Sequence, residues 1–574
     1  MSREPGAGSR EPGAGSREPG AGSREPGAGS REPGAESVWG TFECEGTILA
    51  VARTLTSVYR LLEASELFRD DFRVKFVFTV NDTSAFSSGV REVLRGAGVR
   101  LVSWRSVREK EISYDLALSA SENIDFQYLT AHTVVLPHGL GFNKFVPDSN
   151  GTGVRLAGLP PDRVLRDGRA TVVLSHPEQR EQLLAASPVS SDRTEVVGDP
   201  TLDRLRASRS LRARYREALG AGDRTLVTLA STWRPDSLLG RWRTLPGQLL
   251  SELPSDLYQV SAALHPNIWA FYGKAQISLW LSSALEAGLV LLPPESGWQA
   301  ALVAADQVIT DHGSLGLFAA ALDKPLLLTE PTTETVPGTP PDALARTAGI
   351  LDPRARLRQQ VDRVRLDHQA GQFDRITDRV FAHTGHATTN LRNLIYRKLD
   401  LAPRTEEPSL RRIPVPELRG SHVLSHLVHT VAVDGDSLHV TRFPAAVGQG
   451  TDAETHLVVD ETEPDLKTAE RAAVVTRRLP LTEDAAESWA RTTLATYPGA
   501  RIAITATPEG CLAATRNGDL VRIGFAVPHA EYVSLAASAV YCCWLSRDLS
   551  DRTLTVSAGT TAVHLTFQIV PAER

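Results

Sequence analysis

The chain has 574 residues, of which 42% are hydrophobic and 23% charged, and its formal net charge is −6. A chain of this length is too long to fold around one hydrophobic core, and it predicts three or four domains. The small net charge argues against a nucleic-acid-binding surface. No apolar run reaches membrane-spanning length. None of the four cysteines stands in a C-x-x-C pattern, so we expect them to be buried thiols in a reducing cytoplasm.

The chain begins with a repeat. Residues 2–36 are five copies of Ser-Arg-Glu-Pro-Gly-Ala-Gly, the last ending in Glu36. Such a tract has no large apolar side chain with which to offset the entropy of ordering. We therefore expect residues 1–36 to be disordered, and we assign them no chemistry.

Short apolar runs alternate with helical stretches over residues 37–210. The predicted strands are 46–52, 73–80, 99–102, 114–119, 133–137, 171–175 and 194–197, with helices at 54–67 and 87–95. Alternation of this kind indicates βα repeats around a parallel sheet.

A second series of the same kind covers residues 211–401. Its predicted strands are 225–229, 259–264, 289–292, 307–310 and 326–328, followed by a helical region over 352–399. We thus predict an α/β protein with two Rossmann-like halves that face a cleft. That cleft is the expected ligand site, because the carboxyl ends of the strands converge there.

The remaining chain differs in pattern. Residues 402–417 are rich in proline and charge and predict a linker. Residues 418–574 combine alternating strands with a helix over 482–497, which predicts an α+β accessory domain without a recognisable motif.

Polar turns follow five predicted strands, at the end of the sheet that forms sites in α/β proteins. Their notable residues are His138, Gly139 and Lys144; Gly198, Pro200 and Asp203; Thr232, Trp233 and Arg234; His265 and Pro266; and Asp311, His312, Gly313 and Ser314. The last turn leads into a short apolar helix. The N–H groups of Gly313, Ser314 and Leu315 and the Ser314 hydroxyl would form an anion site suited to a pyrophosphate.

Taken together, the five stretches resemble the CDP-glycerol glycerophosphotransferase family, the teichoic-acid polymerases and primases, over about residues 44–400. The matching residues, in chain order, are His138-Gly139, Gly198, Pro200, Asp203, Thr232-Trp233-Arg234, His265-Pro266, Thr310-Asp311, Ser314 and Leu322-Asp323-Lys324-Pro325. Residues 385–399 also look like the closing helix of the GT-B glycosyltransferase fold, which this family adopts. Three departures concern the donor: Lys144 stands one position late, His312-Gly313 replaces a Tyr-Ser pair, and residues 329–340 lack the usual aromatic sequence.

The resemblance implies a transferase that uses CDP-glycerol or another nucleotide-linked donor and a hydroxyl acceptor, either lipid-linked or a cell-envelope polymer. His138 would be the general base, and His265 would assist at the phosphates, since imidazoles suit both tasks. The implied substrate-binding residues are Gly139, Lys144, Thr232, Arg234, Asp311, Gly313 and Ser314. We expect no metal, cofactor or nucleic acid, and a cytoplasmic location or one at the inner face of the membrane.

Two other readings stay open. A UDP-sugar 2-epimerase shares the fold and a similar turn, although its acidic catalytic residues have no clear counterparts here. Alternatively, the two halves bind a ligand or partner without turnover.

His422, His426 and His429 would align on a helix, but no nearby cysteine or carboxylate completes a metal set and the region could be a strand.

Overall fold

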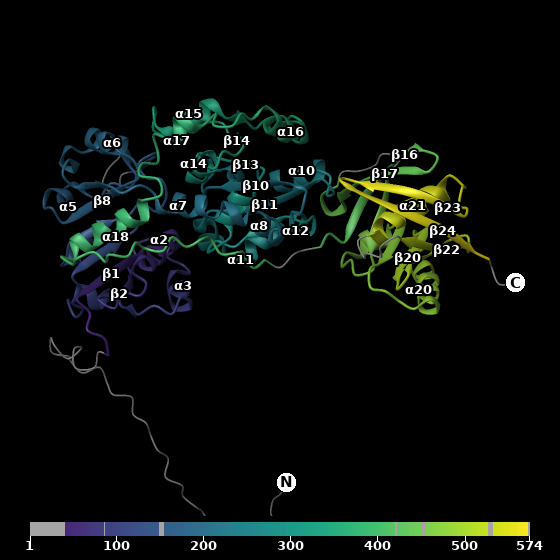
Figure 1. Cartoon of the computed structure of the whole chain (residues 1–574), viewed down its shortest axis with the longest axis horizontal. Helices are drawn as coiled ribbons and strands as arrows, with labels where there is room; N and C mark the ends of the chain where they lie inside the picture. Colours follow the sequence, from purple (N-terminus) through teal and green to yellow (C-terminus); the bar gives the residue numbers. More distant parts are fainter. Residues whose placement is uncertain are drawn as a thin grey trace, which may run out of the picture. The chain divides into compact units, whose positions relative to one another are not determined.

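The computed structural model describes residues 41–84, 86–147, 154–418, 422–448, 455–525 and 532–571 (Figure 1). The repeat at residues 1–36, expected to be disordered, lies outside the described residues.

The first half is built on a parallel seven-stranded sheet of order β3-β2-β1-β4-β5-β8-β9. Its strands are β1 (Gly46–Ala52), β2 (Val74–Val80), β3 (Leu101–Val102), β4 (Leu116–Ser119), β5 (Thr133–Val135), β8 (Ala170–Leu174) and β9 (Thr194–Val196). Its main helices are α2 (Leu55–Ser65), α3 (Val90–Gly96), α4 (Trp104–Arg108), α5 (Asp162–Arg166), α6 (Glu178–Ala186) and α7 (Pro200–Ala207). The short antiparallel strands β6 (Phe145–Pro147) and β7 (Val154–Leu156) pair beside the sheet. The sheet is parallel, as predicted. Its strands are continuous apolar runs, such as β1, because strands of a parallel sheet are buried on both faces.

The second half contains a parallel six-stranded sheet of order β12-β11-β10-β13-β14-β15, as predicted. Its strands are β10 (Thr225–Ser231), β11 (Tyr258–Leu264), β12 (Val290–Leu292), β13 (Gln307–Thr310), β14 (Leu326–Leu328) and β15 (Gly349–Ile350). Its helices are α8 (Arg212–Ala218), α9 (Leu238–Arg241), α10 (Leu245–Glu252), α11 (Pro266–Trp280), α12 (Ser282–Glu286), α13 (Trp298–Ala304), α14 (Ser314–Ala321), α15 (Pro340–Thr347), α16 (Leu357–Asp367) and α17 (Asp374–Thr377).

The expected helical region 352–399 is broken into α16, α17 and α18 (Ala387–Lys398). Gly371 and Gly385 have φ of 76° and 85° in the two breaks, a conformation that glycine adopts without strain. After the second break, α18 returns to the first half. Leu391, Ile395 and Tyr396 are buried in the same core as β1 and α2. The last helix of the α/β region therefore completes the core of the first half.

The C-terminal region has strands and helices, as expected, but they form a closed barrel of order β16-β17-β23-β24-β22-β21-β20-β19-β18. The strands are β16 (Ser425–Asp434), β17 (Ser437–Pro444), β18 (Thr455–Asp460), β19 (Val474–Arg477), β20 (Ile502–Thr507), β21 (Gly510–Thr515), β22 (Leu520–Phe525), β23 (Arg552–Ala558) and β24 (Thr561–Val570); the helices are α19 (Leu466–Glu470), α20 (Glu483–Thr496) and α21 (Tyr532–Leu545).

Helix α21 fills the interior of the barrel. It packs against β16 to β21 and β23, and its apolar residues share one core with the inward side chains of these strands. Because small residues such as Ala536, Ala537 and Ala539 cover much of the helix, the strands can close around it.

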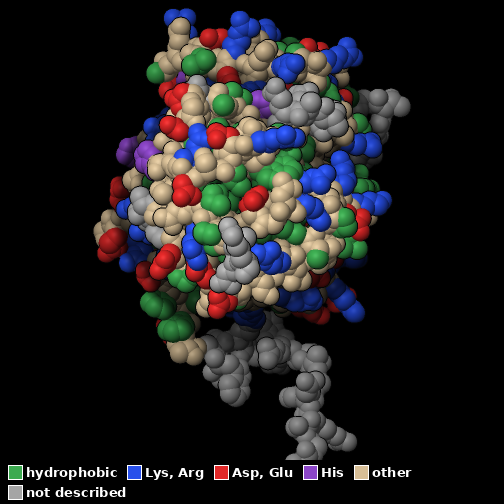
Figure 2. All heavy atoms as spheres, turned by 90° about the vertical axis from the view of Figure 1, so that its right-hand side faces the viewer, with side chains coloured by type: hydrophobic (Ala, Val, Ile, Leu, Met, Phe, Trp, Pro, Cys, Tyr) green, Lys and Arg blue, Asp and Glu red, His purple; other side chains and the backbone are tan. Residues whose placement is uncertain are grey.

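On the face shown in Figure 2, basic and acidic side chains are interspersed, in keeping with the small net charge.

Among the described helices, none is long and apolar enough to cross a membrane.

Candidate active site

One cavity of about 700 Å³ gathers residues from both halves. The first half contributes His138, Gly139 and Lys144 from the segment after β5. The second half contributes residues after β10, β11 and β13, namely Thr232, Arg234, His265, Gly313 and Ser314. The structure thus brings eight of the nine predicted site residues together. Asp311, the ninth, lines an adjoining cavity of about 380 Å³.

Asp311 organises the site from beneath. Asp311 is only 2% exposed. Its Oδ2 accepts hydrogen bonds from Thr232 N, Thr232 Oγ1 and Leu238 N at 2.8–2.9 Å. Its Oδ1 accepts the Gly313 N–H at 3.1 Å. The carboxylate therefore joins the turns after β10 and β13. Asp311 and Thr232 are thus hydrogen-bonded to each other, and this contact holds the two turns together.

The start of α14 retains part of the expected anion site. The Gly313 N–H is occupied by Asp311, which removes one of the three predicted donors. The N–H groups of Ser314 and Leu315 have no hydrogen-bond partner in the described part of the chain. Two free N–H groups at a helix N-terminus attract an anion.

Two glycines allow the backbone to come close at this point. A Cβ on Gly313 would lie 2.5 Å from Thr232 Cγ2, and one on Gly139 would lie 2.8 Å from Ser314 Oγ. The Ser314 hydroxyl accepts the Leu140 N–H at 3.0 Å, so it joins the two halves and still has its own proton to donate.

A strap formed by residues 143–145 and 334–336 also joins the halves. Phe145 N donates to Glu334 O at 2.9 Å, and Val336 N donates to Asn143 O at 3.0 Å. Lys144 and Thr335 form the β-bridge between the two segments. The strap carries Lys144 into the cavity, where burial lowers the pKa of its ammonium group and Asp311 and Glu334 partly oppose this shift.

Glu334 forms an ion pair with Arg234 and lies near His312, whose pKa is lowered by burial. Its carboxylate lies 2.7 Å from Arg234 Nη1 and 3.8 Å from His312 Nε2. Arg234 has a φ of 86° and lies over the Trp233 ring, 4.8 Å from its centroid. Glu334 belongs to no sequence motif, because it is a lone acidic residue in a proline-rich loop.

The two predicted catalytic histidines differ in their surroundings. His138 is exposed and faces the cavity from the first half. His265 caps α11, and its Nδ1 accepts the Asn267 N–H at 3.1 Å. Burial, together with His138 and Lys144, lowers the pKa of His265 to about 3. His265 is therefore neutral near pH 7 and suits hydrogen-bond donation from Nε2, not charge neutralisation or proton transfer.

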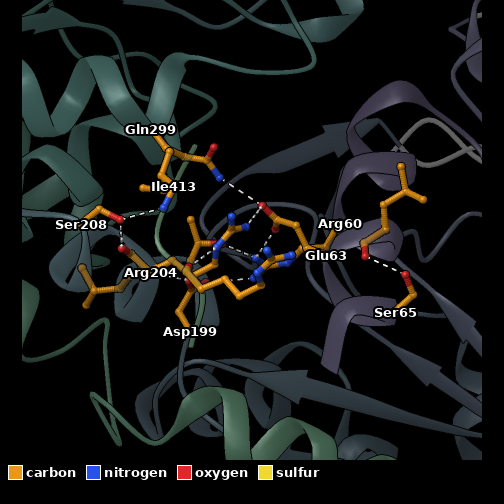
Figure 3. A network of polar contacts seen from close by, with 12 residues as sticks. Arg60, Glu63, Ser65, Asp199, Arg204, Ser208, Gln299 and Ile413 are labelled. Carbon is orange, nitrogen blue, oxygen red and sulfur yellow. Dashed lines mark hydrogen bonds and ion pairs between the residues drawn. The ribbon is translucent and has the colours of Figure 1, made fainter. Parts of the chain in front are cut away.

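Charged side chains from α2 also line the cavity, although no sequence motif predicted them. Arg60 pairs with Asp199 at 3.1 Å, and Glu63 accepts hydrogen bonds from Arg204 at 2.9 Å and from Gln299 at 3.0 Å (Figure 3). Gln299 lies on α13, so this network is a further connection between the halves.

Two other residues of the motifs, Asp203 and Lys324, form hydrogen bonds with main-chain groups. Asp203 accepts the N–H groups of Gly385 at 2.6 Å and Ala387 at 3.0 Å, which fixes the start of α18. Burial raises the pKa of Asp203 despite these bonds. Lys324 donates to the carbonyls of Val303 at 3.1 Å and Ala305 at 2.7 Å, at the end of α13. Burial lowers the pKa of Lys324 to about 8.

The three histidines near residue 425 do not align on a helix. His426 and His429 lie on β16, three residues apart, and His422 precedes the strand. Within the described ranges, no group of three His, Cys, Asp or Glu residues could hold a metal ion.

No protein-family model matches the chain, and no curated protein matches it. Similar solved structures include the wall teichoic acid polymerase TagF, with 15% identity, a TM-score of 0.44, and coverage of 62% of this chain and 90% of that one. Staphylococcus aureus MnaA with UDP has 12% identity and a TM-score of 0.41 over 63% and 99% of the two chains. Anabaena HepE with UDP and glucose has 12% identity and a TM-score of 0.34 over 62% and 95%. Similarities this low assign no activity to the chain.

Proposed function

We propose that the chain is a GT-B-like transferase resembling CDP-glycerol glycerophosphotransferases. It moves a glycerophosphate or glycosyl group from a nucleoside-diphosphate-activated donor to an acceptor hydroxyl. One observation carries the proposal: the N-terminus of α14 and Arg234, from the second half, line a single cavity with Lys144 and the exposed imidazole of His138, from the first. Anion-binding groups on one side and a proton acceptor on the other are what nucleotide-dependent transfer to a hydroxyl requires.

The second half, together with Lys144 from the first, supports donor binding in this proposal. The free N–H groups of Ser314 and Leu315 and the Ser314 hydroxyl donate to the diphosphate. Arg234 and Lys144 add positive charge, and the Nε2–H of His265 adds a neutral hydrogen bond. Such groups stabilise the charge that develops on the departing nucleotide.

The first half supports acceptor activation. His138 takes the proton from the acceptor hydroxyl while its oxygen attacks the donor. For a glycerophosphate, the oxygen bonds to the β-phosphorus, the bond to the α-phosphate oxygen breaks, and a nucleoside monophosphate leaves with the electron pair. For a glycosyl group, the attack is at the anomeric carbon and the nucleoside diphosphate leaves.

Calorimetric titration of the full chain with CDP, UDP, GDP and ADP tests the proposal. A preference for CDP that weakens in Ser314→Ala and Arg234→Ala would support a glycerophosphotransferase-like enzyme. A preference for UDP would favour a sugar transferase or an epimerase. The exposed residues Ser283 and Arg214 lie outside the cavity, so Ser283→Ala and Arg214→Ala are matched controls. Failure to bind any of the four nucleotides would overturn the proposal.

A further inference from the structure

The backbone passes between the two halves three times. It enters the second half between α7 and α8, and it returns to the first between α17 and α18. Residues 402–416, which we call the brace, then lead from the end of α18 back to the core of the second half. None of these residues lines either cavity. The brace therefore joins the halves outside the candidate site.

The beginning of the brace is held by the first half. The carbonyl oxygen of Ala402 accepts a hydrogen bond from Arg73 Nη1 at 3.1 Å. That of Glu406 accepts one from Arg392 Nη2 at 2.7 Å, and Arg392 is a buried residue of α18. Four prolines restrict the backbone of the brace and leave it little slack: Pro403, Pro408, Pro414 and Pro416.

Ile413 anchors the brace in the second half. Its side chain is 2% exposed and belongs to the core formed by α8, α13 and α14. Its N–H group donates to Ser208 Oγ at 2.9 Å (Figure 3), and its carbonyl oxygen accepts the Tyr215 hydroxyl at 2.6 Å. Withdrawing this residue would expose apolar surface and break both hydrogen bonds.

The strap formed by residues 143–145 and 334–336 is the weaker connection. Its hydrogen bonds are donated by Phe145 N and Val336 N, and the residues that it joins are only partly buried. Water can replace such bonds at little cost, whereas the anchor of the brace is an aliphatic side chain inside a core. When the halves separate, the strap should therefore break first.

We propose that the brace limits how far the two halves can separate, so that the cleft opens at the strap and pivots about Ile413. Domains joined by short segments generally move about those segments, where a few hinge residues absorb the change. A third connection anchored in both halves adds a limit that the other two crossings do not provide. This limit holds whether or not the cavity binds a nucleotide.

A protease cleavage site inserted between Ser409 and Leu410 tests the brace in the full chain. Both residues are exposed, and the cut leaves each end of the brace attached to its own half. Hydrogen exchange at the amides of Phe145 and Val336 is measured before and after cutting, so the uncut protein is its own control. We expect exchange there to become about tenfold faster, because opening no longer requires a buried aliphatic side chain to leave its core.

A substitution removes the anchor without a cut. Ile413→Ala should accelerate exchange in the strap in the same way, whereas Val415→Ala, at a 43% exposed position of the brace, should not. In the cut protein, exchange in β1 and β10 reports whether each half stays folded, and it should be unchanged. Equal exchange in the strap before and after cutting would overturn the proposal. Faster exchange in β1 or β10 of the cut protein would also overturn it, because the brace would then stabilise the halves themselves.

Discussion

His138 and His265 line the same cavity but can perform different chemistry. His138 is exposed, whereas His265 uses Nδ1 to cap its own helix and has its pKa lowered by burial to about 3. The surroundings, more than the residue type, therefore separate a proton acceptor from a hydrogen-bond donor.

Replacing His138 tests its role as the base. We expect His138→Ala to lower turnover by roughly 10²- to 10⁴-fold, the usual range for a lost general base. Nucleotide affinity should change less than twofold, because the side chain lies on the acceptor half. Turnover and calorimetric affinity are measured in parallel, with His439→Ala in the exposed part of the barrel as the control. Unchanged turnover would show that another group accepts the proton.

Glu334 is paired with Arg234 and, under the proposed function, would compete with a bound phosphate for it. Glu334→Gln keeps the shape of the side chain and removes its charge, so we expect pyrophosphate to bind on the order of fivefold more tightly. Glu330→Gln, at an exposed position of the same loop, should have no such effect. Calorimetry at low salt makes the comparison, and equal or weaker binding by Glu334→Gln would contradict it.

At the scale of the element, the turn between β9 and α7 depends on a glycine. Gly198 has a φ of 91°, and a Cβ there would lie 2.5 Å from Ala382 O and 2.9 Å from Ala387 Cβ. The turn touches the segment that leads into α18. Close packing and backbone conformation therefore both require glycine.

We expect Gly198→Ala to lower the free energy of unfolding by about 2–4 kcal/mol, from the clash and the positive φ together. Gly220 also has a positive φ, 64°, but a Cβ there meets nothing within 4 Å. Gly220→Ala should cost only about 1 kcal/mol, the backbone part alone. Urea denaturation compares the two variants, and equal losses would rule out the contact with Ala382.

Sequence patterns predicted the elements whose signals are local. The strands of both sheets are apolar runs, so β1 and β10 could be located without a structure. Helix α21 was missed because it is apolar on every side, and a helix inside a barrel has no amphipathic period. Barrel closure itself depends on pairings such as β17 with β23, more than a hundred residues apart, which no local pattern encodes.

The candidate site was predictable to the same extent. Residues in short motifs, such as Arg234 and Ser314, were found and lie together around the cavity. Glu334 was not found, because its position depends on the strap between the halves. The Asp311 carboxylate was identified, but its four hydrogen bonds within the protein could not be seen in the sequence.

At the scale of the whole molecule, each folded region contains a histidine whose pKa is lowered because its ring is partly or fully removed from water. Burial lowers the pKa of His132 in the first half to about 4, of His265 in the second half to about 3, and of His456 in the barrel to about 4. In the unfolded chain a histidine titrates near pH 6.5, so below that pH the unfolded state binds more protons.

We therefore expect the free energy of unfolding to fall as the pH drops from about 6.5 to about 4. For His456, which is 5% exposed, the shift corresponds to on the order of 3 kcal/mol over this window. His456→Phe can keep the stacking on Tyr541, 4.3 Å away, while removing the titrating group. Thermal unfolding between pH 7 and pH 4.5 should show a weaker pH dependence in this variant. An unchanged pH dependence would contradict the assignment.

The return of α18 has a consequence for the order in which a ribosome makes the protein. Leu394, Ile395 and Tyr396 belong to the core of the first half, although almost the whole second half is synthesised before them. A nascent first half therefore waits with part of its apolar surface uncovered, and nascent chains with such surface are those that chaperones protect. We expect ribosome-bound chains that end before residue 387 to be cut readily by protease within residues 45–210, and chains in which α18 has emerged to resist.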